Sequence, residues 1–403
     1  MSPITRRRFG ILGAGSLAAL TIPVGSAKSA PPLGPLAKQG GSALATLGGV
    51  SRGSSNETIE DVVRRTALEA TDFSWLSRGD RVLIKTVCNS GGDYPFTTDP
   101  VALRAMIQLL KERGAGKVLV ADMSGVQAVR FSKDRTSGST RALMTQNAMA
   151  KTAEDAGAEV HAFEEAGWDG FFEERPAVDT AWPSPVMMPN VVNQIDHIVL
   201  MPRCARHVLA GSTLGLKAAV GWWRHDSRLA YHHRGASLPE KTAEANSVPS
   251  LIEKQRLVIS SATKVVSTFG PDNGYVREPD TGLIIASPSV VAHDMLSLSW
   301  LLENLRLTPE AKKGGFMDDP HLSPRVISVM NRLVVNWLDG GVGKVFSSDS
   351  PPSIRHESIW DDRVLHRAFE VFDGVPTLEI ADALGDLPAP LMQMMKRSTA
   401  RPS

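Results

Sequence analysis

The sequence predicts an α/β protein with a mostly parallel sheet, helices on both faces and Rossmann-like βαβ units. Short apolar runs alternate along the chain with longer segments in which apolar residues recur every third or fourth position. A strand, a helix and a second strand follow one another at 81–85, 99–113 and 117–122, which is the spacing of a βαβ unit with a right-handed crossover. Contents of 42% apolar and 22% charged residues describe an ordinary globular protein.

The first βαβ unit follows a helix that the apolar spacing predicts over 58–75. The three central residues of the run Arg81–Lys85 are all apolar and do not alternate with polar ones, as expected of a strand buried on both faces. Asp99 can cap a helix whose first position is Pro100, and Gly114 ends that helix. The apolar run that follows is therefore placed in a neighbouring parallel strand.

The same alternation continues toward the C-terminus, so both faces of the sheet are expected to be covered by helices. Strands are predicted over 159–163, 197–201, 264–269 and 283–286, and helices over 140–156, 213–223, 289–305 and 324–338.

The N-terminus has the pattern of a twin-arginine export signal. Arg6, Arg7 and Phe9 precede an uncharged run over 10–24, and small residues ending at Ala27 suit cleavage by a signal peptidase. The alternative is a membrane anchor, but the run is shorter than the roughly 20 apolar residues that span a bilayer. We expect transport by the twin-arginine translocase to the periplasm, with no membrane span after cleavage.

The remainder of the chain is expected to form one large domain with two flanking segments. Residues 28–56 are rich in Gly, Ser, Ala and Pro and predict a flexible linker. Residues 57–310 carry the α/β pattern, and 311–403 are expected to be a helical C-terminal extension.

Charge and cysteine content exclude several classes of function. A net charge of +1 gives no electrostatic case for nucleic acid or a membrane surface. Cys88 and Cys204 are the only cysteines, whereas a cubane iron–sulfur cluster normally takes four thiolates, so no such cluster is expected within this chain. The periplasm permits a disulfide between them, and the sequence does not show whether their Cα atoms come close enough.

Polar side chains follow the predicted parallel strands at their carboxyl ends, where open α/β sheets bind ligands. Lys85 and Asn89 follow the first strand, Asp122 ends the second, and Arg206 and His207 follow a third. The alternative is that these residues are polar only because loops are solvated. We expect a small anionic ligand at this edge.

The segment 207–234 concentrates residue types used in catalysis and metal binding. Imidazole is a common metal ligand and general base, and arginine can clamp a carboxylate. The histidine spacing matches neither a zinc ribbon nor a His-Glu-x-x-His helix, and a solvated basic loop that binds an anion is the alternative. The candidates are His207 and Lys217 for catalysis, Arg224 and Arg228 for ligand binding, and His225, His232 and His233 for a metal.

Two familiar motifs are absent from the sequence. The run 211–217 lacks the spacing of a phosphate-binding loop, and no Gly-x-Ser-x-Gly elbow occurs. An NTPase and a serine hydrolase of the elbow type are therefore not supported.

A series of short segments follows one order along the chain: 82–85, 98–100, 117–122, Met201, Pro202, His207, 213–217, Gly221, Gly270, Pro271, Gly274 and 287–294. In this shared order, over roughly residues 78–305, the chain resembles the family of the domain of unknown function numbered 362. Some positions depart from the family pattern: Thr86–Asn89 intervenes where proline and asparagine usually follow the first strand, Arg206 replaces a lysine, and Ala218 replaces an asparagine. The ferredoxin-like cysteine clusters of some members are missing. The resemblance implies the fold and the location of the site, but little mechanism.

A fainter resemblance concerns the nickel-pincer lactate racemases. His207, Lys217 and His233 occur in the order of a histidine base, a lysine that tethers the cofactor and a histidine that ligates nickel. The resemblance implies that His207 takes the substrate hydroxyl proton, Lys217 holds the pincer and His233 binds nickel. Loading before export would account for the twin-arginine signal, although no second catalytic histidine is found upstream.

Together these observations favour an exported protein that binds a metal (nickel or another divalent ion) or a small anionic ligand. It would be a cofactor-dependent enzyme or a redox accessory of a partner protein. A different class is a non-catalytic periplasmic binding or assembly protein for a cofactor-bearing partner, with Trp222 and Trp223 as candidates for its exposed apolar surface. A racemase-like enzyme acting on 2-hydroxy acids is the second alternative.

Overall fold

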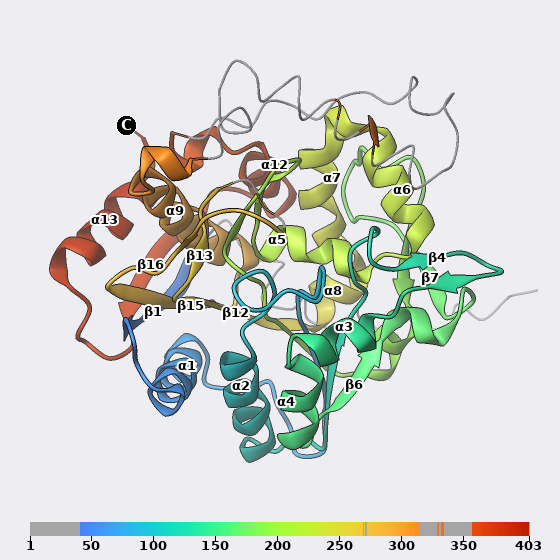
Figure 1. The fold of residues 1–403 in the computed structure, drawn as a ribbon, viewed down its shortest axis with the longest axis horizontal. Helices are drawn as coiled ribbons and strands as arrows, with labels where there is room; N and C mark the ends of the chain where they lie inside the picture. Colours follow the sequence, from blue (N-terminus) through green and yellow to red (C-terminus); the bar gives the residue numbers. More distant parts are fainter. Residues whose placement is uncertain are drawn as a thin grey trace, which may run out of the picture. The chain divides into compact units, whose positions relative to one another are not determined.

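A computed structural model describes residues 41–268, 270, 272–313, 329, 332–333 and 357–402. Within them lies an eight-stranded sheet in the order β16-β1-β15-β12-β9-β2-β3-β6, with helices packed on both sides (Figure 1). The predicted α/β class is confirmed. The predicted signal residues Arg6, Arg7, Phe9 and Ala27, and nearly all of the helix expected over 324–338, lie outside the described residues.

One half of the sheet is entirely parallel. β2 (Arg81–Lys85) lies between β3 (Lys117–Asp122) and β9 (His197–Leu200), and all three run in the same direction. β6 (Glu159–Ala162) is parallel to β3, and β12 (Gln255–Ala262) is parallel to β9. The carboxyl ends of five neighbouring strands therefore share one edge.

The other half shows that the predicted linker and helical extension are partly wrong. β15 (Thr281–Ser287) runs antiparallel to β12 and to β1 (Ser42–Ser51), and β16 (Thr377–Asp382) pairs in parallel with β1 at the sheet edge. Residues 42–51 are thus a sheet strand within the expected linker, and the C-terminal region contributes a strand as well as helices.

The small residues of β1 have a packing reason. A Cβ on Gly48 would collide with the side chains of Val62 and Thr66 in α1 (Asn56–Ala70), which crosses the strand at close range. A glycine-rich composition that is typical of a linker is here required by a helix lying against the strand.

The helices form a layer on each face of the sheet (Figure 1). Alternate side chains divide between the two faces: Val82 and Ile84 join the core under α1, whereas Leu83 joins an aromatic cluster on the opposite face. The first face carries α1, α2 (Pro100–Glu112), α3 (Thr140–Gln146) and α4 (Met149–Asp155), and the second carries α5 (Gly215–Ala218), α6 (His225–His233), α7 (Leu238–Glu244), α8 (Pro249–Lys254), α9 (Val290–Arg306), α12 (Arg363–Val371) and α13 (Ala389–Thr399).

Smaller sheets lie beside the large one. They are formed by β4 (Arg130–Phe131) with β5 (Thr136–Ser137), by β7 (Phe171–Glu174) with β8 (Val186–Pro189), and by β11 (Gly211–Thr213), β10 (Ala205–His207), β13 (Val265–Val266) and β14 (Val276–Arg277) in that order. The strand expected over 264–269 is only β13, and β12 was not predicted. The helix expected over 213–223 is divided into α5 and a 3₁₀ turn, Ala219–Trp222.

Two further expectations concern particular side chains. Trp222 and Trp223 are buried in the aromatic cluster, so they do not provide the exposed surface expected for a partner. Cys88 and Cys204 are buried and not bonded to each other. Within the ranges that the structure covers, no helix has the length and apolar character to cross a membrane.

Candidate functional site

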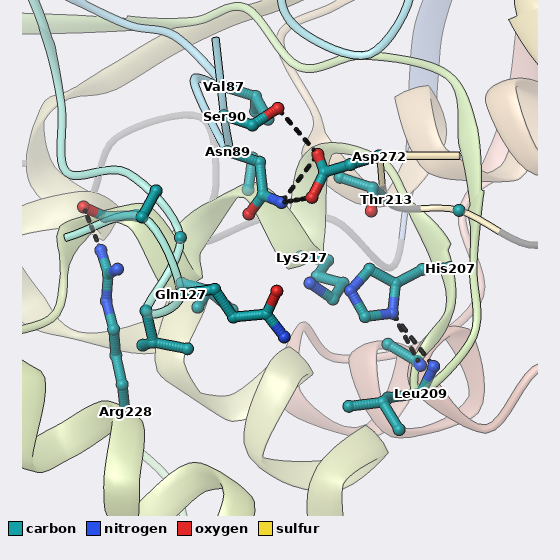
Figure 2. Close-up of a pocket in the computed structure, with 18 of the residues that line it drawn as sticks. Val87, Asn89, Ser90, Gln127, His207, Leu209, Thr213, Lys217, Arg228 and Asp272 are labelled. Carbon is teal, nitrogen blue, oxygen red and sulfur yellow. Dashed lines mark hydrogen bonds between the residues drawn. The ribbon is translucent and has the colours of Figure 1, made fainter. Parts of the chain in front are cut away.

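A cavity of about 530 Å³ opens at the carboxyl ends of β9, β2 and β3 (Figure 2). Loops that follow these strands build its upper wall, and α5 and α6 build much of the rest. It brings together seven of the predicted site residues, namely Lys85, Asn89, Asp122, His207, Lys217, Arg228 and His232.

Lys85 and Asp122 form a buried ion pair at the base of the cavity, with an Nζ–Oδ1 distance of 2.6 Å. Lys85 also donates to the carbonyl oxygens of Thr86 at 2.7 Å and Ala218 at 3.3 Å. Burial lowers the pKa of Lys85, and the Asp122 carboxylate opposes that shift. Gly221 leaves room for the pair, because a Cβ there would collide with both charged groups.

Lys217 lines the same cavity in a very different environment. It lies on α5 and is half-buried, and its amino group has no hydrogen bond or ion pair with any other residue that the structure describes. Burial lowers its pKa to about 7, and the nearby cations Arg203 and Arg228 act in the same direction, while Asp272 opposes them. A substantial fraction of this amine is therefore uncharged near neutral pH.

Arg203 follows β9 and supplies a second cation without a counterion in contact. Its side chain is 1% exposed, and its Nε and Nη1 atoms lack hydrogen-bond partners in the described part of the chain. Burial lowers its pKa to about 10, and the carboxylates of Asp272 and Asp122 oppose that shift. The guanidinium remains charged at neutral pH with donors left for a ligand.

His207 is held in one tautomer by the backbone. Its Nδ1 accepts hydrogen bonds from the amides of Leu209 at 3.1 Å and Ala210 at 3.3 Å. The neutral ring therefore carries its hydrogen on Nε2, on the edge that Figure 2 shows turned toward Lys217. Burial, reinforced by Lys217 and Arg203, holds the pKa of His207 well below its usual value. This neutral donor does not suit the proton-accepting role that the racemase resemblance implied.

Arg228 was expected to bind a ligand, but its donors are directed at main-chain carbonyls. Its guanidinium holds the loop after β3 against α6 (Figure 2), which is a structural role. The acceptors are the carbonyl oxygens of Trp223 at 2.9 Å, Ser124 at 2.5 Å, Met123 at 2.7 Å and Gly221 at 3.3 Å.

Asp272 is a cavity residue that the sequence did not single out. Its carboxylate accepts from Asn89 Nδ2 at 2.9 and 3.1 Å and from Ser90 Oγ at 3.0 Å. The sequence showed only the composition of a turn there. The one indication in the sequence is Gly270. In the structure it has a φ of +48°, and a Cβ there would collide with the carbonyl oxygen of Arg206, so the turn must approach the site closely.

Four predicted residues are not part of the cavity lining. Arg206 donates to the carbonyl of Gly211 at 3.2 Å, and Arg224 pairs with Asp226 at 2.9 Å and stacks on Trp168. His225 and His233 do not line the cavity either.

The histidines expected to bind a metal are divided, because His232 lines the cavity and His225 and His233 do not. Among the residues whose positions are described, no group of three or more His, Cys, Asp or Glu side chains is arranged to hold a metal ion. The set His207, Lys217 and His233 is split, because His233 lies outside the cavity that holds the other two. These residues therefore do not fit a nickel-pincer group in the way that the fainter resemblance implied.

The cavity as a whole suits an anion with an apolar body. Lys85 and Asp122 form an ion pair. Among the described residues, Arg203 and Lys217 have no carboxylate in contact, and the nearby Asp272 is hydrogen-bonded to neutral groups. Apolar walls adjoin these cations and are formed by Val87, Met123, Val126, Val208, Leu209, Val220 and Leu238.

No curated protein matches. Among solved structures, a protein from Thermotoga maritima is similar at 12% identity with a TM-score of 0.38, over 62% of this chain and 59% of that one. The lactate racemase apoprotein from Thermoanaerobacterium thermosaccharolyticum is similar at 14% identity with a TM-score of 0.35, over 61% of this chain and 55% of that one. The chain thus spans less than two thirds of either protein, and neither likeness bears on the chemistry of the cavity.

A family model matches residues 82–299, which is more than half of the chain. The match begins in β2 and ends in α9, so it includes the strands and loops that form the cavity. The chain belongs to the family described as a domain of unknown function (DUF362).

Proposed function

We propose that this protein binds an amphipathic organic anion, with a carboxylate at Arg203 and Lys217 and an apolar body against the cavity walls. The observation that carries the proposal is the presence of two cavity cations that have no counterion in contact among the residues the structure describes. An uncompensated buried charge costs free energy, and that cost is relieved when an anion binds.

The neighbouring groups support the same ligand class. The Nε2–H of His207 is a neutral donor for a second oxygen of the ligand. A volume of about 530 Å³ lies within the range of sites for small organic ligands, and most of such a ligand would face apolar side chains. A small inorganic anion would leave those side chains against water.

The place of action in this proposal is the periplasm. Arg6, Arg7 and Phe9, followed by a cleavage position after Ala27, favour delivery by the twin-arginine translocase. A mature chain that begins at Lys28 in the periplasmic fraction is the expected result, and a full-length chain kept in the cytoplasm would contradict this part of the proposal.

The ligand-binding proposal is tested by isothermal titration calorimetry with 3-phenylpropionate, a carboxylate with an apolar body. Arg203→Met should weaken binding by about tenfold or more, because a charge-assisted contact contributes on the order of 1.5–3 kcal/mol. Arg306→Met is the control, since Arg306 is an exposed residue of α9 that pairs with Glu303. Absence of binding by the unsubstituted protein, or equal loss in both variants, would overturn the proposal.

A further inference from the structure

The two lysines that line the cavity differ in what holds their amino groups. Lys85 forms an ion pair with one carboxylate and donates to two carbonyls, so three acceptor oxygens surround its nitrogen. The amino group of Lys217 has no such partner within the described ranges, and the charges of Arg203, Arg228 and Asp272 act on it without a hydrogen bond or ion pair. A protein that needed only a cation at this point could have supplied a paired lysine, as it does at Lys85.

We propose that Lys217 is a nucleophile that forms an imine with the carbonyl group of an anionic ligand of the 2-oxo acid class. The inference rests on the proposed function, because Arg203 must hold the carboxylate that places the carbonyl carbon beside Lys217. An amine made nucleophilic by burial and by neighbouring cations is a recurrent way of activating lysine.

The step balances without any other reactant. The lone pair on Nζ of Lys217 forms a bond to the carbonyl carbon, and the proton that nitrogen loses passes to the carbonyl oxygen, giving a carbinolamine. The hydroxyl then leaves as water together with the second proton of the nitrogen, whose lone pair forms the C=N bond, so nothing is oxidised or reduced.

His207 is the neighbour that the carbonyl oxygen requires. With Nδ1 occupied by the amides of Leu209 and Ala210, the ring presents Nε2–H on the side of Lys217. A hydrogen bond from Nε2 to the carbonyl oxygen stabilises the negative charge that develops there during attack. A histidine with the opposite tautomer would offer a lone pair instead of a donor.

The test is reductive trapping on the full chain with phenylpyruvate and cyanoborohydride, which converts an imine to a stable secondary amine. Intact mass and peptide mapping are expected to show one adduct, on the peptide that contains Lys217, with Lys85 unmodified in the same sample. Excess 3-phenylpropionate should suppress the adduct, because it occupies the site but has no ketone.

Lys217→Arg is the matched variant, since it keeps a cation for the carboxylate and removes the nucleophile. It should give no adduct even at phenylpyruvate concentrations that calorimetry shows to fill the site of the variant. If 3-phenylpropionate binds to the unsubstituted protein and no adduct forms, the imine is refuted and the anion site stands. Scattered adducts on several lysines that 3-phenylpropionate does not suppress would also refute it, whereas failure to bind 3-phenylpropionate at all would overturn both proposals.

Discussion

Asp294 on α9 accepts the backbone amide of Gly215 at 2.8 Å, two residues before Lys217 in the short helix α5. Its second oxygen accepts the amide of Leu216, also at 2.8 Å, and its first oxygen is bonded to Nδ1 of His293 as well. One buried carboxylate therefore satisfies the two amides that begin α5, and it sets the direction in which Lys217 projects into the cavity.

Asp294→Asn should consequently act on the position of Lys217. The asparagine amide can accept from only one of the two backbone amides, and its NH₂ group would face the other. Reductive trapping at Lys217 should slow by about tenfold, while binding of 3-phenylpropionate should fall by less, because Arg203 is held by other elements. Trapping rate and affinity are to be measured on the same folded sample, and equal losses in both would show a general structural defect instead of a positioning role.

The affinity for a simple carboxylate should depend on pH through Lys217. Its pKa of about 7 means that the amine loses its charge as the pH rises through neutrality, whereas Arg203 and Arg228, whose pKa values are about 10, stay charged. The affinity for 3-phenylpropionate should therefore fall by up to about tenfold between about pH 6 and about pH 8.5. His207 remains neutral in this range because its pKa is well below the usual value.

Two variants test whether the pH dependence comes from Lys217 or from another group near it, such as Asp272 or His232. Lys217→Arg should abolish most of the pH dependence, since arginine stays charged. His232→Gln removes the other cavity histidine and should leave the dependence in place. Calorimetric titrations over the pH range provide the measurement, and an unchanged slope in Lys217→Arg would assign the effect to another group.

Two substitutions of His207 should have opposite consequences. Asparagine can present an oxygen near the position of Nδ1 and so keep the bonds to Leu209 and Ala210, but it has no donor at the position of Nε2. Glutamine can place an NH₂ group near Nε2 but leaves the two amides without their acceptor.

His207→Asn should therefore fold normally and slow trapping at Lys217, and His207→Gln should lower the melting temperature and keep part of the trapping. The expected loss in the asparagine variant is about tenfold to a hundredfold, which is within the range for removing one donor to a developing oxyanion. Thermal unfolding and trapping kinetics measured side by side check both variants. A glutamine variant that is as stable as the unsubstituted protein would contradict the role assigned to Nδ1.

The sequence predicted which edge of the sheet carries the cavity, because ligands bind at the carboxyl ends of parallel strands and the direction of the strands follows from the βαβ pattern. Lys85 and Asp122 end adjacent parallel strands, so their meeting follows from the βαβ pattern alone. Asp272 comes from a loop between antiparallel elements, and its arrival beside Asn89, 183 positions earlier in the chain, depends on tertiary packing that no local pattern encodes.

Two predictions from the sequence were wrong because a composition typical of one structure arose here for another physical reason. β1 resembles a linker because α1 packs so closely that Gly48 cannot carry a side chain. The basic residues of α6 resemble a ligand cluster, but the helix turns them in different directions, so that Arg228 and His232 line the cavity and His233 does not. Spacing along the chain could not resolve that division, because it depends on which face of the helix is buried.

Two variants that each remove a charge should differ in their effect on stability, and the contrast tests which cavity cation is available to a ligand. Arg203→Met removes a buried charge that has no carboxylate in contact and whose Nε and Nη1 lack partners among the described residues, so the melting temperature should stay the same or rise. Lys85→Met removes one member of a buried ion pair and leaves the Asp122 carboxylate without its cation, which should destabilise the fold by about 3–5 kcal/mol. Thermal and denaturant unfolding of the ligand-free chain measure both effects. A loss of several kcal/mol in Arg203→Met would show that Arg203 supports the fold, and its unpaired donors would then no longer argue for a ligand.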